Sequence, residues 1–384
     1  MLKNSFLLVT LIIINLFVSS TAYGKAAPPT IKSKAAVMID AKTGAILFEK
    51  NADASMYPAS LTKMATAIYA IENGNLNVIV TVSEKARNTD GTKVYLEKGE
   101  QVTLRKLIQG LLINSGNDAG VAIAEHLSGN LKTFSTDINN YLKEKIKVKH
   151  THFQNPHGLY DPEHQTTAKD LAKITQYALK NETFKEIFGT KKLKWNGKTW
   201  DTTLLTHHKL LRGEIPYEGI TGGKTGFVNE SGYTLATSAK RDDLSLIVIT
   251  LNSRTNKDAY DDTTKLLDYG FNHFQRDSIE AGKIFEIGTE KFQATKQLFF
   301  THLLNDVIDL NIKNDGTLQI KDGEGDVIQS FDLQEVNEEA SNHSSSMEED
   351  ETKDLFQKNS SMWLLITALL LLSSFAILRQ RFRK

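Results

Sequence analysis

Apolar residues are most concentrated at the two ends of this 384-residue sequence, and the first such run lies in residues 1–24. A single base, Lys3, precedes an uncharged and mostly apolar stretch that begins at Phe6 and ends with Ala22-Tyr23-Gly24. A basic start, an apolar centre and small residues at the end are typical of a secretory signal peptide. We therefore predict a signal peptide at residues 1–24, with an uncleaved N-terminal anchor as the alternative.

The second apolar run, residues 362–378, contains no charged side chain. In a helix that rises about 1.5 Å per residue, a run of this length is near the lower limit for crossing a bilayer. Residues 379–384 follow with four bases, and such a basic cluster stays on the cytoplasmic side. The pattern predicts a transmembrane helix at 362–378 and a basic cytoplasmic tail at 379–384. The protein would then cross the cell membrane once, with its main part outside.

Between these runs, the period of the apolar residues changes along the chain. Strand-like runs at residues 35–40 and 45–49 flank Gly44 and predict a β-hairpin. Residues 60–73 have a helical period and stop before Gly74, and glycine is common just after a helix. Further helices are predicted at residues 103–113, 118–127 and 170–179, strands at 233–238 and 243–251, and a helix at 257–274.

The order of these elements indicates the fold class. Strands stand at both ends of residues 25–276 and helices fill the middle, so this segment is expected to form one α+β domain whose sheet joins the two ends. Short strand-like runs in residues 277–333 predict a small β-rich domain. Residues 334–361 are acidic and serine-rich with few apolar side chains, which predicts a flexible linker.

The charge balance limits the classes of partner, and the cysteine content limits how the fold can be stabilised. The chain has 46 Lys and Arg residues and 46 Asp and Glu residues. Lys3 and the tail at 379–384 hold five of these bases and no acid, which leaves 41 bases against 46 acids elsewhere. A net-acidic external part argues against nucleic acid as a partner. Cysteine is absent from the sequence, so an ordinary hydrophobic core must stabilise the fold without disulfides.

Three short motifs supply the candidate chemistry: Ser60-Leu-Thr-Lys63, Ser115-Gly-Asn117 and Lys224-Thr-Gly226. In a helix, residues i and i+3 are neighbours, so the Lys63 amine is expected beside the Ser60 hydroxyl. An amine whose pKa is lowered by burial can take the proton of a serine and make that serine nucleophilic. Taken alone, Ser60 is also compatible with a helix cap next to an ordinary surface lysine.

In this order, the three motifs are those of penicillin-recognising serine acyl-transferases. The sequence resembles the D-alanyl-D-alanine carboxypeptidases, or low-molecular-mass penicillin-binding proteins, of the peptidase S11 family. Residues 155–159, 166–170 and 206–211 match further stretches of that family. The resemblance implies a β-lactamase/transpeptidase-like domain, followed by a small β-rich domain and a C-terminal membrane attachment.

The resemblance also implies a catalytic role for four residues. Ser60 would attack the carbonyl carbon of the penultimate D-alanine, and Lys63 would accept the serine proton. Ser115 would relay a proton to the leaving amine. Asn117 would orient Lys63 and the substrate amide.

Four further residues are expected to bind substrate. Lys224 and Thr225 would hold the free carboxylate of the substrate, and Gly226 would let an edge strand approach the ligand closely. The oxyanion hole would consist of the backbone N–H groups of Ser60 and Phe227.

A second Lys-Thr-Gly stands at residues 42–44 and has to be distinguished from the first. It precedes Ser60 and falls in the predicted hairpin turn, whereas the family motif follows Ser-x-Asn and leads into a strand. This order selects Lys224. Two departures are Gly116, where many β-lactamases carry aspartate, and the lack of a clear E-x-x-L-N motif downstream. Arg254 is either a helper of the carboxylate site or, as the simpler interpretation, a structural surface residue.

The histidines do not form a recognisable metal motif. His152, His157 and His164 are spaced five and seven residues apart, which does not place them on one helical face, and the sequence has no H-E-x-x-H. We therefore expect hydrogen-bonding roles for them, and neither a metal nor a cofactor.

The resemblance predicts a serine-type D-Ala-D-Ala carboxypeptidase that removes the terminal D-alanine from peptidoglycan stem pentapeptides and so limits cross-linking. Its expected partners are these stem peptides, β-lactam antibiotics that acylate the serine, and the cell membrane. The same acyl-enzyme could instead serve a transpeptidase, an endopeptidase or a β-lactamase. An alternative of another class is a non-catalytic β-lactam sensor or wall-binding protein.

Overall fold

The structure is a computed structural model that describes residues 27–336. The predicted signal peptide, transmembrane helix and cytoplasmic tail, and most of the predicted linker, lie outside the described residues. Within residues 27–336, no helix combines the length and the apolar character needed to span a membrane.

A five-stranded sheet with the strand order β2-β1-β9-β8-β7 organises the fold. Its strands are β1 (Ala35–Asp40), β2 (Ile46–Lys50), β7 (Ile220–Val228), β8 (Gly232–Arg241) and β9 (Leu244–Ser253). All four neighbouring pairs are antiparallel, and β1 from the start of the chain pairs with β9, which places Ala36 opposite Thr250. The α+β class is confirmed, because the sheet joins the two ends of the segment.

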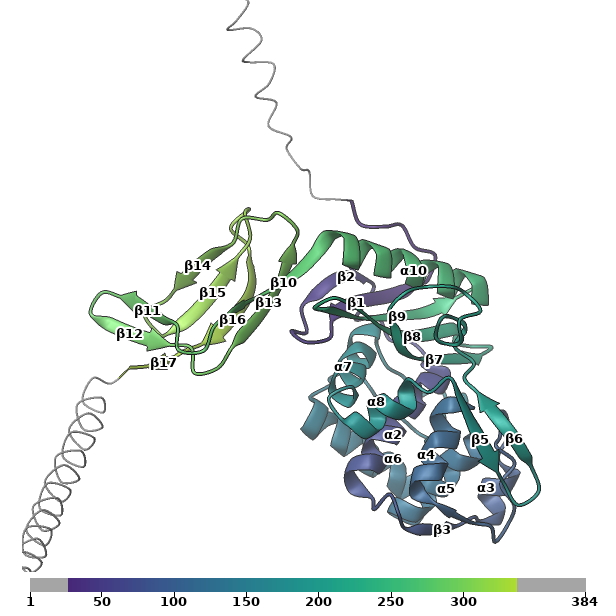
Figure 1. Cartoon of the computed structure of the whole chain (residues 1–384). Coiled ribbons are helices and arrows are strands. Elements are labelled where there is room, and N and C mark those ends of the chain that lie inside the picture. The colour runs from purple at the N-terminus through teal and green to yellow at the C-terminus, as the bar shows by residue number, and fades with distance from the viewer. Residues whose placement is uncertain (1–26, 337–384) are drawn as a thin grey trace, which may run out of the picture. The chain divides into compact units, whose positions relative to one another are not determined.

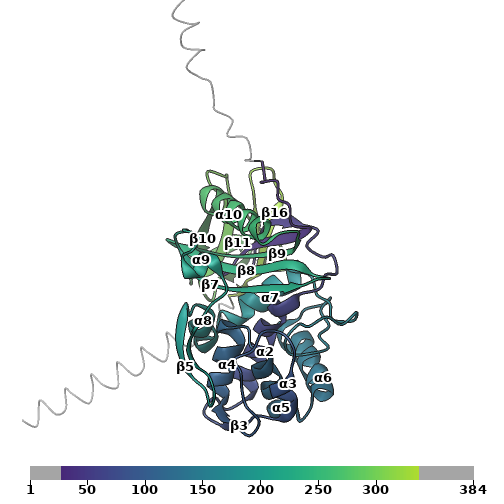
Figure 2. The ribbon, with the colours of Figure 1, turned by 90° about the vertical axis from the view of Figure 1, so that its right-hand side faces the viewer.

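Helices cover both faces of this sheet (Figures 1 and 2). One face packs against α10 (Asn256–His273), and α7 (Ala168–Ala178) packs against the other. The remaining helices are η1 (Ala59–Leu61), α2 (Thr62–Asn73), α3 (Glu84–Asn88), α4 (Leu104–Ile113), α5 (Asn117–Ser128), α6 (Leu131–Tyr141), the π-helix η2 (Leu142–Ile146), α8 (Glu182–Phe188) and α9 (Lys209–Arg212). Two further pairs of antiparallel strands form between these helices in the sequence: β3 (Ile79–Thr81) with β4 (Gln101–Thr103), and β5 (Lys192–Asn196) with β6 (Asp201–Leu205).

The alternation of side chains in β1 explains why this strand is apolar along its whole length. Val37 and Ile39 pack into the core shared with the α2 and α4 helices, whereas Ala36 and Met38 pack into the core under α10. A central strand that is covered on both faces buries every side chain and therefore reads as a continuous apolar run. The predicted strand at residues 35–40 is confirmed, and the helix predicted at 60–73 forms as η1 followed by α2.

The last strands are β10 (Phe274–Ile279), β11 (Ile284–Ile287), β12 (Glu290–Gln293), β13 (Leu298–Leu303), β14 (Asp309–Ile312), β15 (Thr317–Lys321), β16 (Val327–Asp332) and β17 (Gln334–Glu335). The chain forms two compact units, and the described part of the second comprises Ile279–Leu298, Leu310–Gln319 and residues 330–336. In the second unit, β12 pairs with both β11 and β17.

Two segments of the expected β-rich domain, Phe299–Asp309 and Ile320–Gln329, belong to the first unit. A buried polar contact helps to hold the first of these segments, Phe299–Asp309, in the first unit. The hydroxyl of Thr301 donates to the fully buried carboxylate of Asp40 at 2.6 Å, and Arg276 pairs with the same carboxylate at 2.5 Å. A buried carboxylate needs such partners, so the end of β1 depends on a residue more than 200 positions later in the chain.

Candidate active site

Ser60 and Lys63 lie at the junction of η1 and α2, as the i, i+3 spacing predicts. The Nζ atom of Lys63 is 2.8 Å from the Oγ atom of Ser60 and donates to the carbonyl oxygen of His157 at 2.6 Å. Lys63 is fully buried, whereas Ser60 is half-buried and can be reached by a ligand. A surface lysine beside a simple helix cap is therefore excluded.

Burial is the main reason why the pKa of Lys63 lies well below its ordinary value of 10.5. The positive charge of Lys224 lowers it further, and the carboxylate of Asp118 acts in the opposite direction. A buried amine loses the hydration that stabilises its charged form, so the neutral form gains weight. The lowered pKa favours the unprotonated form of Lys63 that a general base next to a serine needs.

The segment before Ser60 is held in a strained conformation. Ala59 has a φ of +47°, in the left-handed region that residues with a side chain rarely adopt. Its carbonyl oxygen accepts from Oγ1 of Thr62 at 2.9 Å, and Nε2 of His164 lies 2.8 Å from that same hydroxyl. The preceding carbonyl, of Pro58, accepts from Oγ1 of Thr234 at 3.0 Å. Strain of this kind persists only where neighbouring contacts over-determine it, and it is common at active sites.

Ser115 and Asn117 lie where α4 turns into α5. Ser115 adopts a φ of +62°, and its Oγ atom is 3.0 Å from the Nζ atom of Lys224. The side-chain amide of Asn117 donates to the carbonyl oxygen of Asp90 at 2.7 Å, which ties the turn to the preceding loop. Asp118 strengthens this tie, because its buried carboxylate accepts from the backbone N–H groups of Val94 and Leu96 at 3.1 Å.

The motif at residues 224–226 lies inside β7, the edge strand of the sheet (Figure 2). Lys224 is only 3% exposed, and burial lowers its pKa to about 7. A Cβ atom at Gly226 would lie 2.8 Å from the backbone nitrogen of Ser60, so only glycine allows β7 to come this close to the serine. Phe227 is 51% exposed and its ring packs on Tyr233 at 4.7 Å.

The structure therefore brings three distant motifs together. Ser60 and Lys63 form one pair, Ser115 and Lys224 form a second, and Gly226 places β7 against the Ser60 turn. Thr225 follows Lys224 on the same strand and its carbonyl oxygen accepts from the Nζ atom of Lys224 at 2.8 Å. The geometry brings two serine hydroxyls and two buried lysine amines with lowered pKa into one site.

Sequence reasoning gave no role to His157, whose carbonyl oxygen orients Lys63. The available signal was the stretch at residues 155–159, in which Gly158 has a φ of +86° and a Cβ atom at that position would clash with the carbonyl oxygen of Ala59. The histidines of this region make hydrogen bonds, as expected. His164 contacts Thr62 and accepts from the backbone of Gln154 at 3.0 Å. Burial holds the pKa of His164 at about 3, so its ring is neutral.

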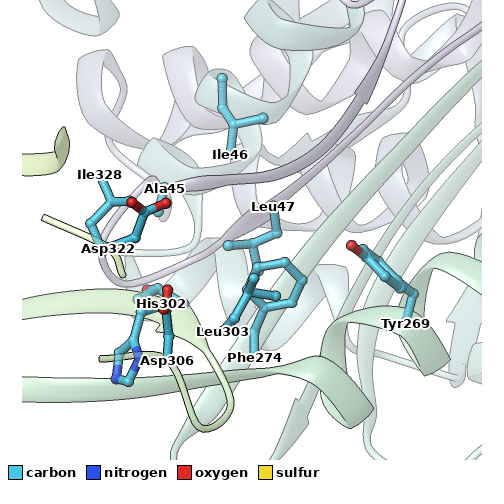
Figure 3. A pocket seen from close by; sticks show the side chains of 11 residues that line it. Ala45, Ile46, Leu47, Tyr269, Phe274, His302, Leu303, Asp306, Asp322 and Ile328 are labelled. Carbon is cyan, nitrogen blue, oxygen red and sulfur yellow. The ribbon is translucent and has the colours of Figure 1, made fainter. Parts of the chain in front are cut away.

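Two other features lie away from these residues. A cavity of about 270 Å³ lies in the first unit, and none of the eight predicted site residues lines it. Figure 3 shows residues that line it, among them Leu47, Tyr269 and Phe274. In the described part of the chain, the acids with a spacing suited to a metal ion are Asp322, Glu324 and Asp326, which lie in one turn and are largely exposed. Acidic clusters of this kind are common on protein surfaces without a metal.

Comparison with known proteins agrees with this geometry. The model of the peptidase S11 family, described as D-alanyl-D-alanine carboxypeptidase, matches residues 22–255. The chain belongs to this family. The matched residues include all three motifs of the site.

Relatives in the family have similar sequences and structures. D-alanyl-D-alanine carboxypeptidase DacF of Bacillus subtilis is 34% identical over 253 residues, which cover 64% of this chain and 63% of DacF. DacA of Haemophilus influenzae is 36% identical over 278 residues, which cover 67% of this chain and 66% of DacA. The chain thus spans slightly less than two thirds of these two relatives. The crystal structure of penicillin binding protein 5 from Haemophilus influenzae has a TM-score of 0.72 and 30% identity, and covers 81% of this chain and 98% of its own.

Proposed function

We propose that this chain is a serine-type D-Ala-D-Ala carboxypeptidase that removes the terminal D-alanine from peptidoglycan stem pentapeptides. One observation carries the proposal: the buried amine of Lys63, with its lowered pKa, lies 2.8 Å from the hydroxyl of Ser60. An adjacent base with a lowered pKa is the feature that makes a serine hydroxyl nucleophilic. Membership of the S11 family supports the choice of substrate.

Acylation begins when Oγ of Ser60 attacks the carbonyl carbon of the penultimate D-alanine and Lys63 takes the serine proton. The negative charge that develops on the carbonyl oxygen is stabilised by the backbone N–H groups of Ser60 and Phe227. The close approach of Gly226, the residue before Phe227, to the backbone nitrogen of Ser60 supports this choice. The bond between the carbonyl carbon and the amide nitrogen then breaks. Ser115 passes its proton to this nitrogen and is reprotonated by Lys63, so the amide nitrogen becomes the amine of free D-alanine and Lys63 is neutral again.

Deacylation follows with water as the acceptor. Lys63, now returned to its neutral form, removes a proton from water, and the resulting hydroxide attacks the ester on Ser60. The shortened peptide leaves with a new carboxylate, and Ser60 recovers its proton. A β-lactam has a carbonyl and a carboxylate in a similar arrangement, so it would acylate the same serine.

Lys224 and Thr225 have the position and chemistry to bind the carboxylate of the terminal D-alanine. Lys224 is held in place by Ser115, and a buried cation gains more from an anion than an exposed one does, because water screens it less. Asn117 stands on the other side of the same turn and is suited to the substrate amide.

Hydrolysis is separated from transfer to an amine acceptor by product analysis with and without that acceptor.

The location of the protein is also a proposal. A signal peptide at residues 1–24 and a transmembrane helix at 362–378 would leave the site outside the cell membrane, where peptidoglycan is found. Cell fractionation is the test, with protease added to intact cells whose wall has been removed. Digestion of the main part of the protein is expected, and protection of that part would contradict an external site.

The catalytic proposal is tested with Ser60→Ala and the matched control Ser55→Ala, which changes an exposed serine of the preceding loop. Ser60→Ala is expected to abolish both the release of D-alanine from a pentapeptide and covalent labelling by fluorescent penicillin. The Ser55→Ala control is expected to retain both. Covalent label on Ser60→Ala would show that another residue is the nucleophile.

A further inference from the structure

The peptide group between Ala59 and Ser60 supplies one donor of the oxyanion hole in the proposed function, on which this inference rests. Its N–H belongs to Ser60 and its carbonyl oxygen belongs to Ala59. The described residues contain no cis peptide bond, and in a trans peptide the N–H and the C=O point in opposite directions. The contacts of the Ala59 carbonyl therefore decide where the N–H of Ser60 points.

The carbonyl group of Ala59 is held from two sides. Oγ1 of Thr62 donates to its oxygen at 2.9 Å, and Gly158 packs so closely that a Cβ atom there would clash with this oxygen. Ala59 has a φ of +47°, a conformation that persists only where such contacts over-determine it. The hydroxyl of Thr62 is the one side-chain group of this pair of contacts, so its own hydrogen bonds matter for the peptide.

The direction of each hydrogen bond behind Thr62 follows from the donors present. The backbone N–H of Gln154 can only donate, and it bonds to Nδ1 of His164 at 3.0 Å. Burial holds the pKa of His164 at about 3, so the ring is neutral and carries its single proton on Nε2. Nε2 lies 2.8 Å from Oγ1 of Thr62 and donates to it. The hydroxyl proton of Thr62 is then free to point at the carbonyl oxygen of Ala59.

The ring of His164 is fixed in its place. The residue is 2% exposed, and the ring stacks on Phe153 with the centroids 4.8 Å apart and the planes at 14°. A buried histidine in an ordinary core satisfies its own polar atoms, and His164 does so with Gln154 and Thr62. Here, however, the hydrogen bonds form a one-way chain that ends at the peptide before the nucleophile. Hydrogen bonds in such a chain polarise one another and gain about 10–30% in strength each.

We propose that His164 is a positioning residue for the oxyanion hole, and that it acts through the hydroxyl of Thr62 on the peptide between Ala59 and Ser60. Each donor in the chain draws electron density toward itself, so the Ala59 carbonyl becomes more polar and the N–H of Ser60 becomes a stronger donor. The same bonds keep that N–H in one direction before substrate arrives. His164 transfers no proton in the reaction.

Four variants separate the hydrogen bonds of this chain. The side chain in His164→Asn is too short to reach Thr62, and His164→Met fills the space of the ring without an N–H donor. His164→Gln can place an N–H where Nε2 lies. Thr62→Val keeps the shape of the side chain and removes the hydroxyl. The matched control is His302→Asn, because His302 is also buried and its Nε2 lies 2.9 Å from the carboxylate of Asp277.

The test uses the full-length protein and two ester substrates that end in D-alanyl-D-lactate. They differ in one atom, since the scissile group is C=O in one and C=S in the other. Sulfur is a weak hydrogen-bond acceptor, so the ratio of kcat/KM for the oxygen ester to that for the sulfur ester measures stabilisation of the oxyanion. A purely structural role of His164 would lower the melting temperature without changing this ratio.

His164→Asn, His164→Met and Thr62→Val are each expected to lower the ratio about 10-fold, less than the loss of a whole oxyanion-hole donor, because the N–H remains but is weaker and less well directed. The His164→Asn/Thr62→Val double variant is expected to match Thr62→Val, since both residues act through one chain. His164→Gln is expected to keep the ratio within about 3-fold of the wild type, because the donor is restored. His302→Asn is expected to lower stability and leave the ratio unchanged.

The outcomes separate this inference from the proposed function. A wild-type ratio in Thr62→Val, or in whichever of His164→Asn and His164→Met folds, would overturn the inference and leave the serine chemistry standing. A ratio lowered equally in His302→Asn would also overturn it, because lost stability would then explain the effect. A pentapeptide that yields no D-alanine, with protein that fluorescent penicillin still labels, would overturn the proposed function instead.

Discussion

The tripeptide Lys-Thr-Gly occurs twice in this chain, and the two copies have different environments. Residues 42–44 form the turn between β1 and β2, where the backbone N–H of Gly44 bonds to the carbonyl oxygen of Asp40 and Lys42 is exposed. Residues 224–226 lie within β7, where Lys224 is buried. The same three residues thus form a turn in one place and part of a candidate ligand site in the other.

The two copies differ in the reason why glycine is needed and in the contact that the lysine makes. Gly44 has a φ of +77°, so glycine is needed there for conformation. Gly226 pairs with Thr234 within the sheet, and glycine is needed there for space against Ser60. Lys42 places its ammonium 4.6 Å from the ring of Phe299, whereas Lys224 contacts the hydroxyl of Ser115. A short motif therefore predicts chemistry only together with the element that carries it.

The largest expected contrast comes from the two lysines. Lys224→Ala is expected to lower kcat/KM for a pentapeptide about 10²- to 10³-fold, because it removes the buried cation that we propose binds the carboxylate. Lys42→Ala is expected to leave kcat/KM unchanged. D-alanine release measures the activity, and thermal unfolding shows that both variants fold. Unchanged kinetics in Lys224→Ala would place the carboxylate site elsewhere.

A smaller contrast is expected from the two glycines. In Gly226→Ala, the new Cβ atom would lie 2.4 Å from Oγ1 of Thr234 and 2.8 Å from the nitrogen of Ser60. This moves β7 away from the serine and is expected to lower the rate of acylation by penicillin about 10- to 100-fold. Gly44→Ala is expected to lower stability by about 1–2 kcal/mol through backbone strain, with normal acylation. Denaturant titration and stopped-flow labelling measure the two effects. Equal acylation rates in the two variants would contradict the close approach of β7.

The pH dependence of activity is expected to reflect both buried lysines. The pKa of Lys63 lies below its ordinary value, and activity should rise with pH as this base loses its proton. Lys224 has a pKa of about 7, so kcat/KM for a carboxylate-bearing peptide should fall above about pH 7 as the free enzyme loses this charge. The expected fall is about ten-fold per pH unit once the pKa is passed. A pH–rate profile that stays flat from pH 7 to 9 would contradict the role of Lys224, and Lys42→Ala should keep the wild-type profile.

The smallest effect is expected at the threonines. Thr43 shares a hydrogen bond of 2.8 Å with Thr301, which also donates to Asp40. Thr43→Val is expected to lower the free energy of unfolding by about 1 kcal/mol, with kcat/KM unchanged. Thr225→Val is expected to weaken carboxylate binding and to raise KM several-fold, with little effect on stability. Urea titration and steady-state kinetics separate the two, and a changed KM in Thr43→Val would give the turn a role in the site.

Much of the fold could be predicted from local patterns. The helical period at residues 60–73 and the apolar run at 35–40 each gave an element that the structure contains. The local pattern did not predict the strand β7, because Gly222, Gly223 and Gly226 lower its strand propensity, and only the resemblance implied an edge strand at Gly226. It forms because it pairs with β8 along its length, a long-range effect that a local window does not contain.

The candidate site was predictable where side chains carry the chemistry. Ser60, Lys63, Ser115 and Lys224 belong to motifs, and the structure brings them together. The carbonyl oxygen of His157 and the strained φ of Ala59 are backbone features, so residue type alone does not reveal them. The partner of the Asn117 amide, the carbonyl oxygen of Asp90, was missed for the same reason.

The pairing of β1 with β9 has a consequence for how the chain folds. Ala36 lies opposite Thr250, so β1 has no partner on that side until more than 200 further residues have been made. Contacts between distant residues are slow to form, because a long loop must close first. We expect the helical segment between them to collapse early and β1 to join the sheet late. Until then its continuous apolar sequence is exposed and prone to aggregate, which makes the closing of the sheet the step where a chaperone would help most.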